Sequence, residues 1–261
     1  MPRTGRPAVR RVAAVERALV LLDALAEAGG ELGTNALARR TRVNPSSVSR
    51  LLATLAAAGY VEHVPASGRY RLGVRLVQLG NAALSGLEIR EVARPHLRAL
   101  AEETGETVTV SAPGEPDAVT VDFVQSASSV LSVAHVGRPS ITHATAVGKV
   151  LLALGGVSLP AGELAAFTNR TITSRQTLAG ELERVRVQGW AEALGEREED
   201  LNAIAAPVWS ARGELDGILG VQGPAARFAG PALEAARVPL LEHALAASEA
   251  LGWKRQTREE G

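Results

Sequence analysis

The hydrophobic pattern of this chain predicts an α+β protein with a small N-terminal helix-turn-helix domain and a larger C-terminal domain built around a sheet. Three observations support this: a punctuated amphipathic helix at 44–58, two short alternating segments directly after it, and a later succession of helices and strand-like runs. The 261 residues, 46% of them apolar, are enough for one small and one medium domain with ample cores.

The helix at 44–58 is marked at both ends. Asn44 can accept hydrogen bonds from the free N–H groups of the first turn, and Pro45 already holds a helical φ. Gly59 suits the left-handed position that commonly ends a helix. Apolar residues recur at i, i+3, i+4 and i+7 and predict one buried face, made of Val48, Leu51, Leu52 and Leu55.

The first turns of this helix also carry a polar surface. Its residues are Ser46, Ser47, Ser49 and Arg50. Short hydroxyls and a guanidinium at the start of a helix can approach base edges and phosphates in a DNA groove. We therefore expect a DNA-recognition helix, with Asn44 at its beginning.

The preceding segment completes a helix-turn-helix. Thr34 can cap a short helix at 35–40 that buries Ala36 and Leu37, and residues 41–43 then turn the chain into the recognition helix.

The segment after the recognition helix predicts a wing. Residues 60–64 and 69–72 alternate as short strands around the turn-forming residues 65–68, which is typical of a β-hairpin. The hairpin places Arg69 and Arg71 beside its tip, where they can face phosphates or the minor groove. The alternative is a basic loop that is only solvated.

Charge is divided unevenly along the chain. The whole sequence has 28 basic and 28 acidic residues, but residues 1–80 hold twelve Arg and five acids, a net charge of +7, which leaves −7 for residues 81–261. A basic N-terminal part favours a polyanionic partner such as double-stranded DNA. The arginines of the arm at 1–11 can bind DNA or form a plain solvated terminus; they are Arg3, Arg6, Arg10 and Arg11.

The first helix has apolar residues on more than one side. The expected core stripe comprises Val12, Val15, Leu19, Leu22 and Ala26. Val20 and Leu21 lie off this stripe, so the helix either packs tightly in a small domain or offers a dimer surface.

The rest of the chain alternates between helical and strand-like segments. A lightly built helix at 76–87 connects the domains, and an amphipathic helix at 91–104 stops at Gly105. Further helices are expected at 144–154, 161–167, 178–188 and 232–251. Strands are expected at 107–110, 118–124, 130–136, 203–209 and 215–221.

Several classes of protein are disfavoured by composition. The chain contains no run of 18 apolar residues, the length that would predict a membrane span. The basic N-terminus lacks the apolar segment that is typical of a secretory signal peptide. The absence of Cys excludes disulfides, thiolate metal sites and Cys nucleophiles. Only Lys149 and Lys254 are Lys, and the Arg, Ala, Leu and Gly usage is typical of a GC-rich bacterial genome, so we expect a cytoplasmic bacterial protein.

Signals for an enzyme, a metal or a cofactor are weak. Gly148-Lys149 lacks the Gly and hydroxyl that a phosphate loop requires around it. His135 and His143 flank one loop, where they could bind a metal or an anion or simply bond a loop carbonyl. The acidic run at 196–200 could hold a cation or form a solvated lid loop. We expect no catalytic residues, no metal and no cofactor.

An ordered set of segments resembles the IclR family of bacterial transcriptional regulators. The segments are VSRLLATLAAAGYVEHVPASGRYRLG, RPHLRALAEETGETV, VGRPSITHATAVGK and IAAPVWSARGELDGILGVQGP. The resemblance implies a winged helix-turn-helix joined by a linker helix to a GAF-like α/β effector-binding domain with a central, mainly antiparallel sheet. It also implies homodimers or dimers of dimers that respond to small organic molecules.

The resemblance and the patterns together give the domain limits. We expect a basic flexible arm at 1–11, the winged helix-turn-helix at 12–74, a linker helix at 75–89, the GAF-like domain at 90–253 and a flexible tail at 254–261.

The chain departs from the family pattern at both proposed sites. A Lys common at the start of the recognition helix is lost, so phosphate contacts are expected to fall to Arg39, Arg40, Arg42 and Arg50. Matched effector positions are Ala146, Val147, Ala193, Ala203, Gly220 and Gln222. Relatives often carry an acid at 193 and a Cys at 203, so this pocket is expected to suit a neutral or weakly polar ligand larger than pyruvate.

Two functions follow. The first is a sequence-specific regulator, a repressor or an activator, whose operator binding is modulated by a small organic effector in the C-terminal domain. The second is an orphan or architectural DNA-binding regulator whose C-terminal domain serves only oligomerisation.

Overall fold

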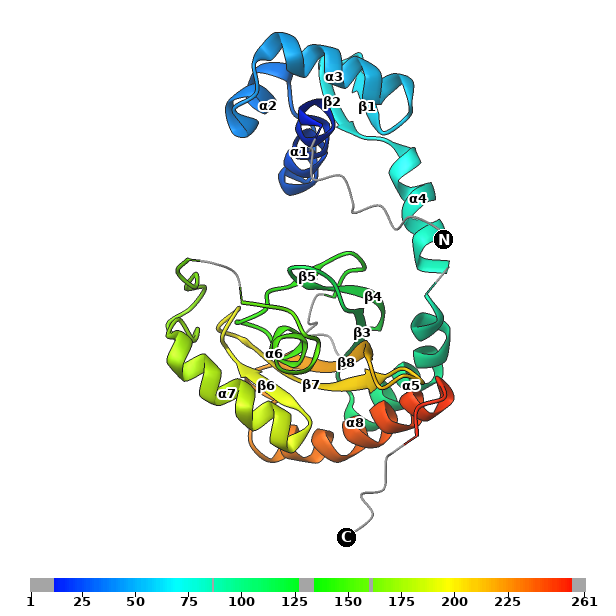
Figure 1. Ribbon diagram of the computed structural model, residues 1–261, viewed down its shortest axis with the longest axis vertical. Helices are drawn as coiled ribbons and strands as arrows, with labels where there is room; N and C mark the ends of the chain where they lie inside the picture. Colours follow the sequence, from blue (N-terminus) through cyan, green and yellow to red (C-terminus); the bar gives the residue numbers. More distant parts are fainter. Residues whose placement is uncertain (1–11, 86, 127–133, 160–161, 255–261) are drawn as a thin grey trace, which may run out of the picture. The chain divides into compact units, whose positions relative to one another are not determined.

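The chain divides into two compact units, residues 1–86 and 87–261 (Figure 1). The computed structural model describes residues 12–85, 87–126, 134–159 and 162–254. The expected arm at 1–11 and most of the expected tail lie outside the described residues. The fold is α+β, as expected from the sequence.

The N-terminal unit begins with the expected helices. They are α1 (Ala13–Ala28), α2 (Thr34–Thr41) and α3 (Pro45–Ala57). The cap of α3 is confirmed, because the side-chain oxygen of Asn44 accepts the N–H of Ser46 at 2.9 Å. Val48 and Leu52 are buried, with Leu51 and Leu55 packed against the same core.

The α2–α3 connection differs in detail from the expectation. Thr34 is the first residue of α2 and does not cap it; Gly33 precedes the helix without a side-chain hydrogen bond. The turn is made by Arg42, which has a left-handed backbone with φ of 55°. A Cβ atom disfavours this conformation, so Arg42 holds a mildly strained position.

The predicted buried stripe of α1 was wrong. Its buried residues are Leu21, Ala24 and Leu25. Most of the expected core residues face solvent instead, with exposed fractions of 61% for Val12, 56% for Val15 and 55% for Leu19. Because apolar residues occur on two sides of α1, its periodicity alone could not identify the side that packs on α2 and α3.

The wing is a hairpin of β1 (Val61–Val64) and β2 (Arg69–Leu72), paired antiparallel. Leu32 adds an antiparallel bridge to Tyr70, which ties the wing to the start of α2. Gly73 is required where the hairpin closes, because a Cβ there would lie 2.2 Å from the carbonyl oxygen of Gly59.

The expected linker helix at 75–89 differs from the structure. Helix α4 (Val74–Ser85) ends before that limit, and α5 starts at Glu88 and runs to Thr104. Gly105 ends α5 in the left-handed conformation, as predicted.

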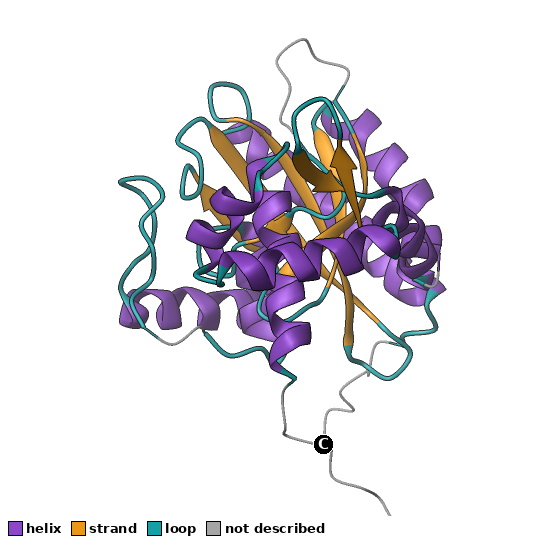
Figure 2. Cartoon of the chain, turned by 90° about the horizontal axis from the view of Figure 1, so that it is seen from above, coloured by secondary structure: helices purple, strands orange, loops and turns teal. Residues whose placement is uncertain are grey.

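The C-terminal unit is built on a sheet with strand order β5-β4-β3-β8-β7-β6, in which every described neighbour pair is antiparallel. The strands are β3 (Thr107–Ala112), β4 (Ala118–Val124), β5 (Pro139–Ser140), β6 (Ala191–Leu194), β7 (Leu201–Trp209) and β8 (Leu215–Pro224). Figure 2 shows the strands side by side as a twisted sheet with helices around it.

Helices cover both faces of this sheet. Helix α8 (Pro231–Ala250) packs with α5 on one face, and α6 (Ala146–Leu154) lies on the other (Figure 1). Helix α7 (Arg175–Gln188) packs against α6 and closes the core at the β6 edge.

Two segments that were expected to be regular are irregular where the structure describes them. The described part of the helix expected at 161–167 is not helical, and residues 134–136 of the strand expected at 130–136 form no strand. Residues 130–133 and 161 lie outside the described residues. Within the described chain, no helix is both long enough and apolar enough to span a membrane.

Candidate nucleic-acid interface and ligand cavity

The first turns of α3 present the expected polar surface. Ser46, Ser49 and Arg50 are exposed, and Ser47 is half-buried. The hydroxyl of Ser46 donates to the Asn44 side chain at 2.8 Å, so that oxygen of Asn44 serves the helix cap. Ser49 and Arg50 are the exposed polar residues of this surface that take no part in the cap.

The remaining expected arginines surround this surface. Arg39, Arg42 and Asn44 line one hollow at the α2–α3 turn. Arg39 also lines a second hollow together with Arg69 of the wing. Arg39 thus borders both the hollow at the α2–α3 turn and the hollow beside the wing, while Arg40 is exposed at the end of α2.

The two wing arginines differ. Arg71 pairs with Glu62 on the opposite strand at 2.9 Å, and this hydrogen bond lowers the pKa of Glu62. Arg69 is exposed and has no carboxylate partner among the described residues. Arg69 is therefore the better placed of the two for a phosphate.

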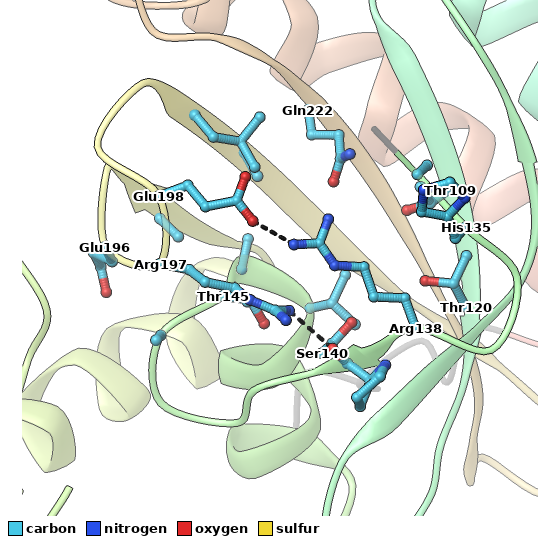
Figure 3. Close-up of a pocket in the computed structure, with 18 residues that line it drawn as sticks. Thr109, Thr120, His135, Arg138, Ser140, Thr145, Glu196, Arg197, Glu198 and Gln222 are labelled. Carbon is cyan, nitrogen blue, oxygen red and sulfur yellow. Dashed lines mark hydrogen bonds and ion pairs between the residues drawn. The ribbon is translucent and has the colours of Figure 1, made fainter. Parts of the chain in front are cut away.

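The C-terminal unit contains a half-enclosed cavity between α6, the sheet and two loops (Figure 3). The volume of this cavity is about 60 Å³. Its lining includes five expected residues, Ala146, Val147, Ala193, Ala203 and Gln222.

Strand register explains why these residues meet. Ala193 on β6 is opposite Ala203 on β7, which is opposite Gln222 on β8. Directly paired residues point to the same face, here the face that α6 covers. Gly148 lets α6 pack against the loop that leads into it, because a Cβ there would lie 2.4 Å from the carbonyl oxygen of Ile141.

Gly220 is a correction to the expected lining, because it lies behind the cavity wall and does not line the cavity. A Cβ at this position would be 2.9 Å from the hydroxyl of Thr109 and 3.3 Å from a methyl of Val147, both of which do line it.

The cavity also carries charged side chains that the sequence did not indicate. Arg138, Arg197 and Glu198 line it together with His135, and Arg138 forms an ion pair with Glu198. Arg197 donates to the carbonyl oxygen of Pro139 at 2.9 Å, and burial together with Arg138 lowers its pKa. The ligand class expected from the sequence, neutral or weakly polar and larger than pyruvate, stays a prediction.

A buried lysine supports the loop that carries Arg197 and Glu198. Lys149 of α6 is only 1% exposed, and its Nζ donates to Glu196 at 2.7 Å and to the carbonyl oxygen of Glu192 at 2.8 Å. Burial lowers the pKa of Lys149, which Glu196 partly opposes. The acidic run at 196–200 is thus not simply a solvated loop, because its first residue is committed to an internal ion pair.

The histidines beside the cavity have separate roles. His143 lies within hydrogen-bond distance of the carbonyl oxygen of Ala165, at 2.9 Å from Nε2, as in the carbonyl-bonding alternative. His135 lines the cavity. In the described residues no cluster of three or more His, Cys, Asp or Glu side chains could hold a metal ion.

Sequence reasoning missed the charged part of the cavity. Arg138 lies inside the VGRPSITHATAVGK segment and Arg197 inside the acidic run, so both were within segments already singled out. The missing information was the folding of these two loops over the same cavity.

The family assignment follows from comparison with known proteins. Residues 14–65 match the IclR helix-turn-helix domain, and residues 81–250 match the bacterial transcriptional regulator IclR C-terminal domain. The chain belongs to the IclR family of transcriptional regulators.

Curated relatives span nearly the same length. The chain is 32% identical over 247 residues to the HTH-type transcriptional regulator XynR of Escherichia coli, covering 93% of this chain and 98% of that protein. It is 33% identical to the glycerol operon regulatory protein of Streptomyces griseus, covering 84% of this chain and 87% of the relative. These relatives are regulators and not enzymes.

Solved structures share the fold. An IclR regulator from Silicibacter sp. TM1040 matches with a TM-score of 0.80 at 27% identity, covering 93% of this chain and 97% of that one. An IclR homologue from Microbacterium hydrocarbonoxydans, crystallised with 4-hydroxybenzoate, matches with a TM-score of 0.74 at 23% identity over 92% of this chain and 99% of that one.

Proposed function

We propose that this chain is a sequence-specific DNA-binding regulator whose operator binding is modulated by a small organic effector in the C-terminal cavity. The observation that carries the proposal is the presence, on one chain, of a capped helix with an exposed polar start and of a half-enclosed cavity lined by polar and charged side chains. The proposed site of action is the bacterial cytoplasm, where operator DNA is found.

In the proposed complex, α3 enters the major groove and Arg50 contacts a base edge. Arg39, Arg40 and Arg42 contact phosphates, and Arg69 of the wing contacts the backbone or the minor groove. The exposed positions of these side chains support this assignment.

Self-association would let two winged helices read a palindromic site. Support comes from exposed apolar residues of the N-terminal unit, which are Val12, Val15, Leu19 and Val20 around α1 and Val74, Val77 and Leu79 on α4. Water-exposed apolar patches of this kind mark protein interfaces. Sedimentation of a Val15→Asp variant tests the proposed self-association. The variant should contain more monomer than the wild type at the same concentration.

The effector must bind one arrangement of the protein better than another, because a ligand of equal affinity shifts no equilibrium. Its proposed binding residues are Ala146, Val147, Ala193, Ala203 and Gln222, with Gly220 behind them.

The test uses operator binding with and without a metabolite panel. Ala203→Trp should fill the cavity and abolish any ligand response while operator affinity is kept, because Ala203 lies between Ala193 and Gln222 on the cavity floor. Ala226→Trp, at an exposed turn, is the matched control.

A metabolite that raises the unfolding temperature of the wild type but not of Ala203→Trp supports effector binding in the cavity. If every responsive ligand still acts on folded Ala203→Trp, the effector site lies elsewhere. If no metabolite changes stability or operator binding, the orphan regulator is the better description.

A further inference from the structure

Two histidines from different helices meet on the face of the sheet that α5 and α8 cover (Figure 1). His96 of α5 and His243 of α8 are 147 positions apart in the sequence, and their Nδ1 atoms lie 3.1 Å apart. The rings are inclined at 63°, so the two nitrogens approach each other and the rings do not stack. His96 is half-buried, and the His243 side chain is 19% exposed, so dissolved ions can reach the pair.

Glu103 sets the tautomer of His243. Its Oε1 lies 3.4 Å from Nε2 of His243, the ring nitrogen that does not face His96. An ionised carboxylate only accepts hydrogen bonds, so the proton of neutral His243 is held at Nε2 and the lone pair of Nδ1 is directed toward His96. A carboxylate that orients an imidazole in this way is the usual partner of a metal-binding histidine.

His96 supplies the second lone pair. Burial, followed by the neighbouring His243, lowers the pKa of His96, which favours the neutral imidazole that metals bind. Without a metal, the Nδ1–H of His96 donates to Nδ1 of His243. When His96 changes to the tautomer with its proton on Nε2, both Nδ1 lone pairs are available to one ion, and no net proton is released.

The separation of the two Nδ1 atoms matches that of neighbouring ligands on one metal ion. Metal–nitrogen bonds of about 2.0–2.1 Å place adjacent nitrogens about 2.9 Å apart in octahedral geometry and about 3.3 Å apart in tetrahedral geometry. The observed 3.1 Å lies between these values. Neither ring therefore has to move far to bind an ion.

We propose that His96 and His243 bind a divalent transition-metal ion of the zinc type through their Nδ1 atoms, with Glu103 orienting His243. Imidazole nitrogens suit zinc, nickel and copper ions. The described residues offer no cluster of three or more His, Cys, Asp or Glu ligands, so water completes the coordination and the ion is exchangeable. The site joins α5 to α8, while the proposed effector cavity lies beside α6, so the two proposals are independent.

The experiment is calorimetric titration of the full, untagged chain with ZnCl₂ at about pH 7.5, where imidazole is neutral, after metal has been removed with a chelator. The wild type should bind one equivalent with a Kd of about 1–200 µM, since two ligands give roughly half the binding free energy of a four-ligand zinc site. His96→Gln and His243→Gln should each weaken binding by about 30-fold or more, because a single imidazole remains. MgCl₂ should not bind, because Mg²⁺ prefers oxygen ligands.

Glu103 is tested as a positioning residue, because it acts through His243. Glu103→Ala should weaken Zn²⁺ binding by about tenfold, the lower end of the usual effect of such a carboxylate, since 50% of its side chain is exposed. Glu103→Gln should recover part of this loss, because its amide oxygen can still accept from Nε2. Glu102→Ala is the matched control: Glu102 is the exposed neighbour on α5, its removal changes the charge equally, and the variant should bind Zn²⁺ like the wild type.

A second measurement uses stability. An ion held by one residue of α5 and one of α8 binds the folded C-terminal unit, so Zn²⁺ should raise the urea midpoint of the wild type. Trp fluorescence follows this unit, which contains every Trp of the chain. The double variant of His96→Gln and His243→Gln should show no such rise.

The inference is overturned if the wild type binds no Zn²⁺, or if the double variant binds it as tightly as the wild type. Either result would leave a plain hydrogen bond between the two histidines. Equal affinity for Mg²⁺ would overturn the class of metal, and equal effects of Glu103→Ala and Glu102→Ala would overturn the orienting role. If a His variant does not fold, Glu103→Ala against Glu103→Gln decides, since both keep the two imidazoles. All of these outcomes leave the proposed effector cavity untouched.

Discussion

The two units of this protein use charge in opposite ways. In residues 1–80 a net charge of +7 is carried by arginines, and those proposed to contact DNA are exposed. Residues 81–261 have a net charge of −7, yet Lys149, Glu181 and Glu196 of this part are buried together. Exposed charges keep their hydration, so they destabilise the fold little, and they attract a polyanion until salt screens them. Buried charges lose their hydration, which is unfavourable, and they fix the geometry of the groups that pair with them.

This difference predicts different consequences of mutation. Removing a charge from the N-terminal unit should change binding and leave the fold intact. Removing one from the buried cluster of the C-terminal unit should change stability first and ligand binding as a consequence.

The largest effect is expected from Lys149→Met. It leaves Glu196 buried without its cation, and breaking a buried pair in this way typically costs about 3–5 kcal/mol. Denaturant unfolding followed by Trp fluorescence isolates this effect, because Trp190, Trp209 and Trp253 all belong to the C-terminal unit.

The other lysine of the chain provides the control. Lys254 is exposed, so Lys254→Met should leave the unfolding midpoint unchanged. Adding Glu196→Gln to Lys149→Met should restore part of the stability, because no unpaired carboxylate then remains. A Lys149→Met protein as stable as the wild type would remove the contrast between the two units.

The next effect is on DNA binding. Arg50→Ala should weaken a specific operator by about 1–3 kcal/mol and relax the preference at one base position, if Arg50 contacts a base edge. Arg40→Ala, as a phosphate contact, should weaken all sequences similarly and flatten the dependence of affinity on salt. Anisotropy titrations with operator and random DNA at several salt concentrations measure both.

Arg50→Ala and Arg40→Ala serve as controls for each other. Both residues are exposed arginines of neighbouring helices, so their folds should be equally stable. Folded Arg50→Ala with unchanged operator affinity would contradict the assignment of α3 as the recognition helix.

A smaller effect is expected on the stability of the N-terminal unit. Arg42→Gly relieves a left-handed conformation, and after the entropy cost of Gly the net gain should be about 0.5–1 kcal/mol. Arg40→Gly, inside α2, should instead lose about 1 kcal/mol. Tyr fluorescence reports the unfolding of this unit, since Tyr60 and Tyr70 are the Tyr residues of the chain. If both variants changed the free energy of unfolding by the same amount and with the same sign, the strain at Arg42 would be contradicted.

The same contrast explains how much the sequence could predict. In the N-terminal unit the cap of α3, the turn and the hairpin depend on residues close in sequence, so local patterns predicted them. Two expectations failed there: Thr34 does not cap α2, and the buried side of α1 depends on packing against α2 and α3. In the C-terminal unit β4 was predicted with its observed limits, but short β5 gave no pattern of its own.

The charged part of the cavity could not be predicted from local pattern. Arg138 and Glu198 are 60 residues apart, and Lys149 and Glu196 are 47 apart. The family resemblance indicated the alanines, Val147 and Gln222 as cavity residues. These residues lie on helices and strands, where positions can be matched between relatives. Two irregular loops bring the arginines to the same cavity, and neither periodicity nor spacing indicates that they meet.

The smallest effect concerns acid sensitivity, which should also belong to the C-terminal unit. His96 of α5 and His243 of α8 approach at 3.1 Å between their Nδ1 atoms, and Glu103 lies 3.4 Å from Nε2 of His243. Burial, followed by the neighbouring His243, lowers the pKa of His96 below its ordinary value of 6.5. On acidification the unfolded chain therefore takes up a proton at His96 before the folded chain does, so stability falls as the pH drops below about 6.5. His96→Gln should lose less stability than the wild type between about pH 7.5 and 5.5, as measured by Trp-monitored urea unfolding. An identical pH dependence in wild type and His96→Gln would show that this histidine pair does not contribute to acid sensitivity.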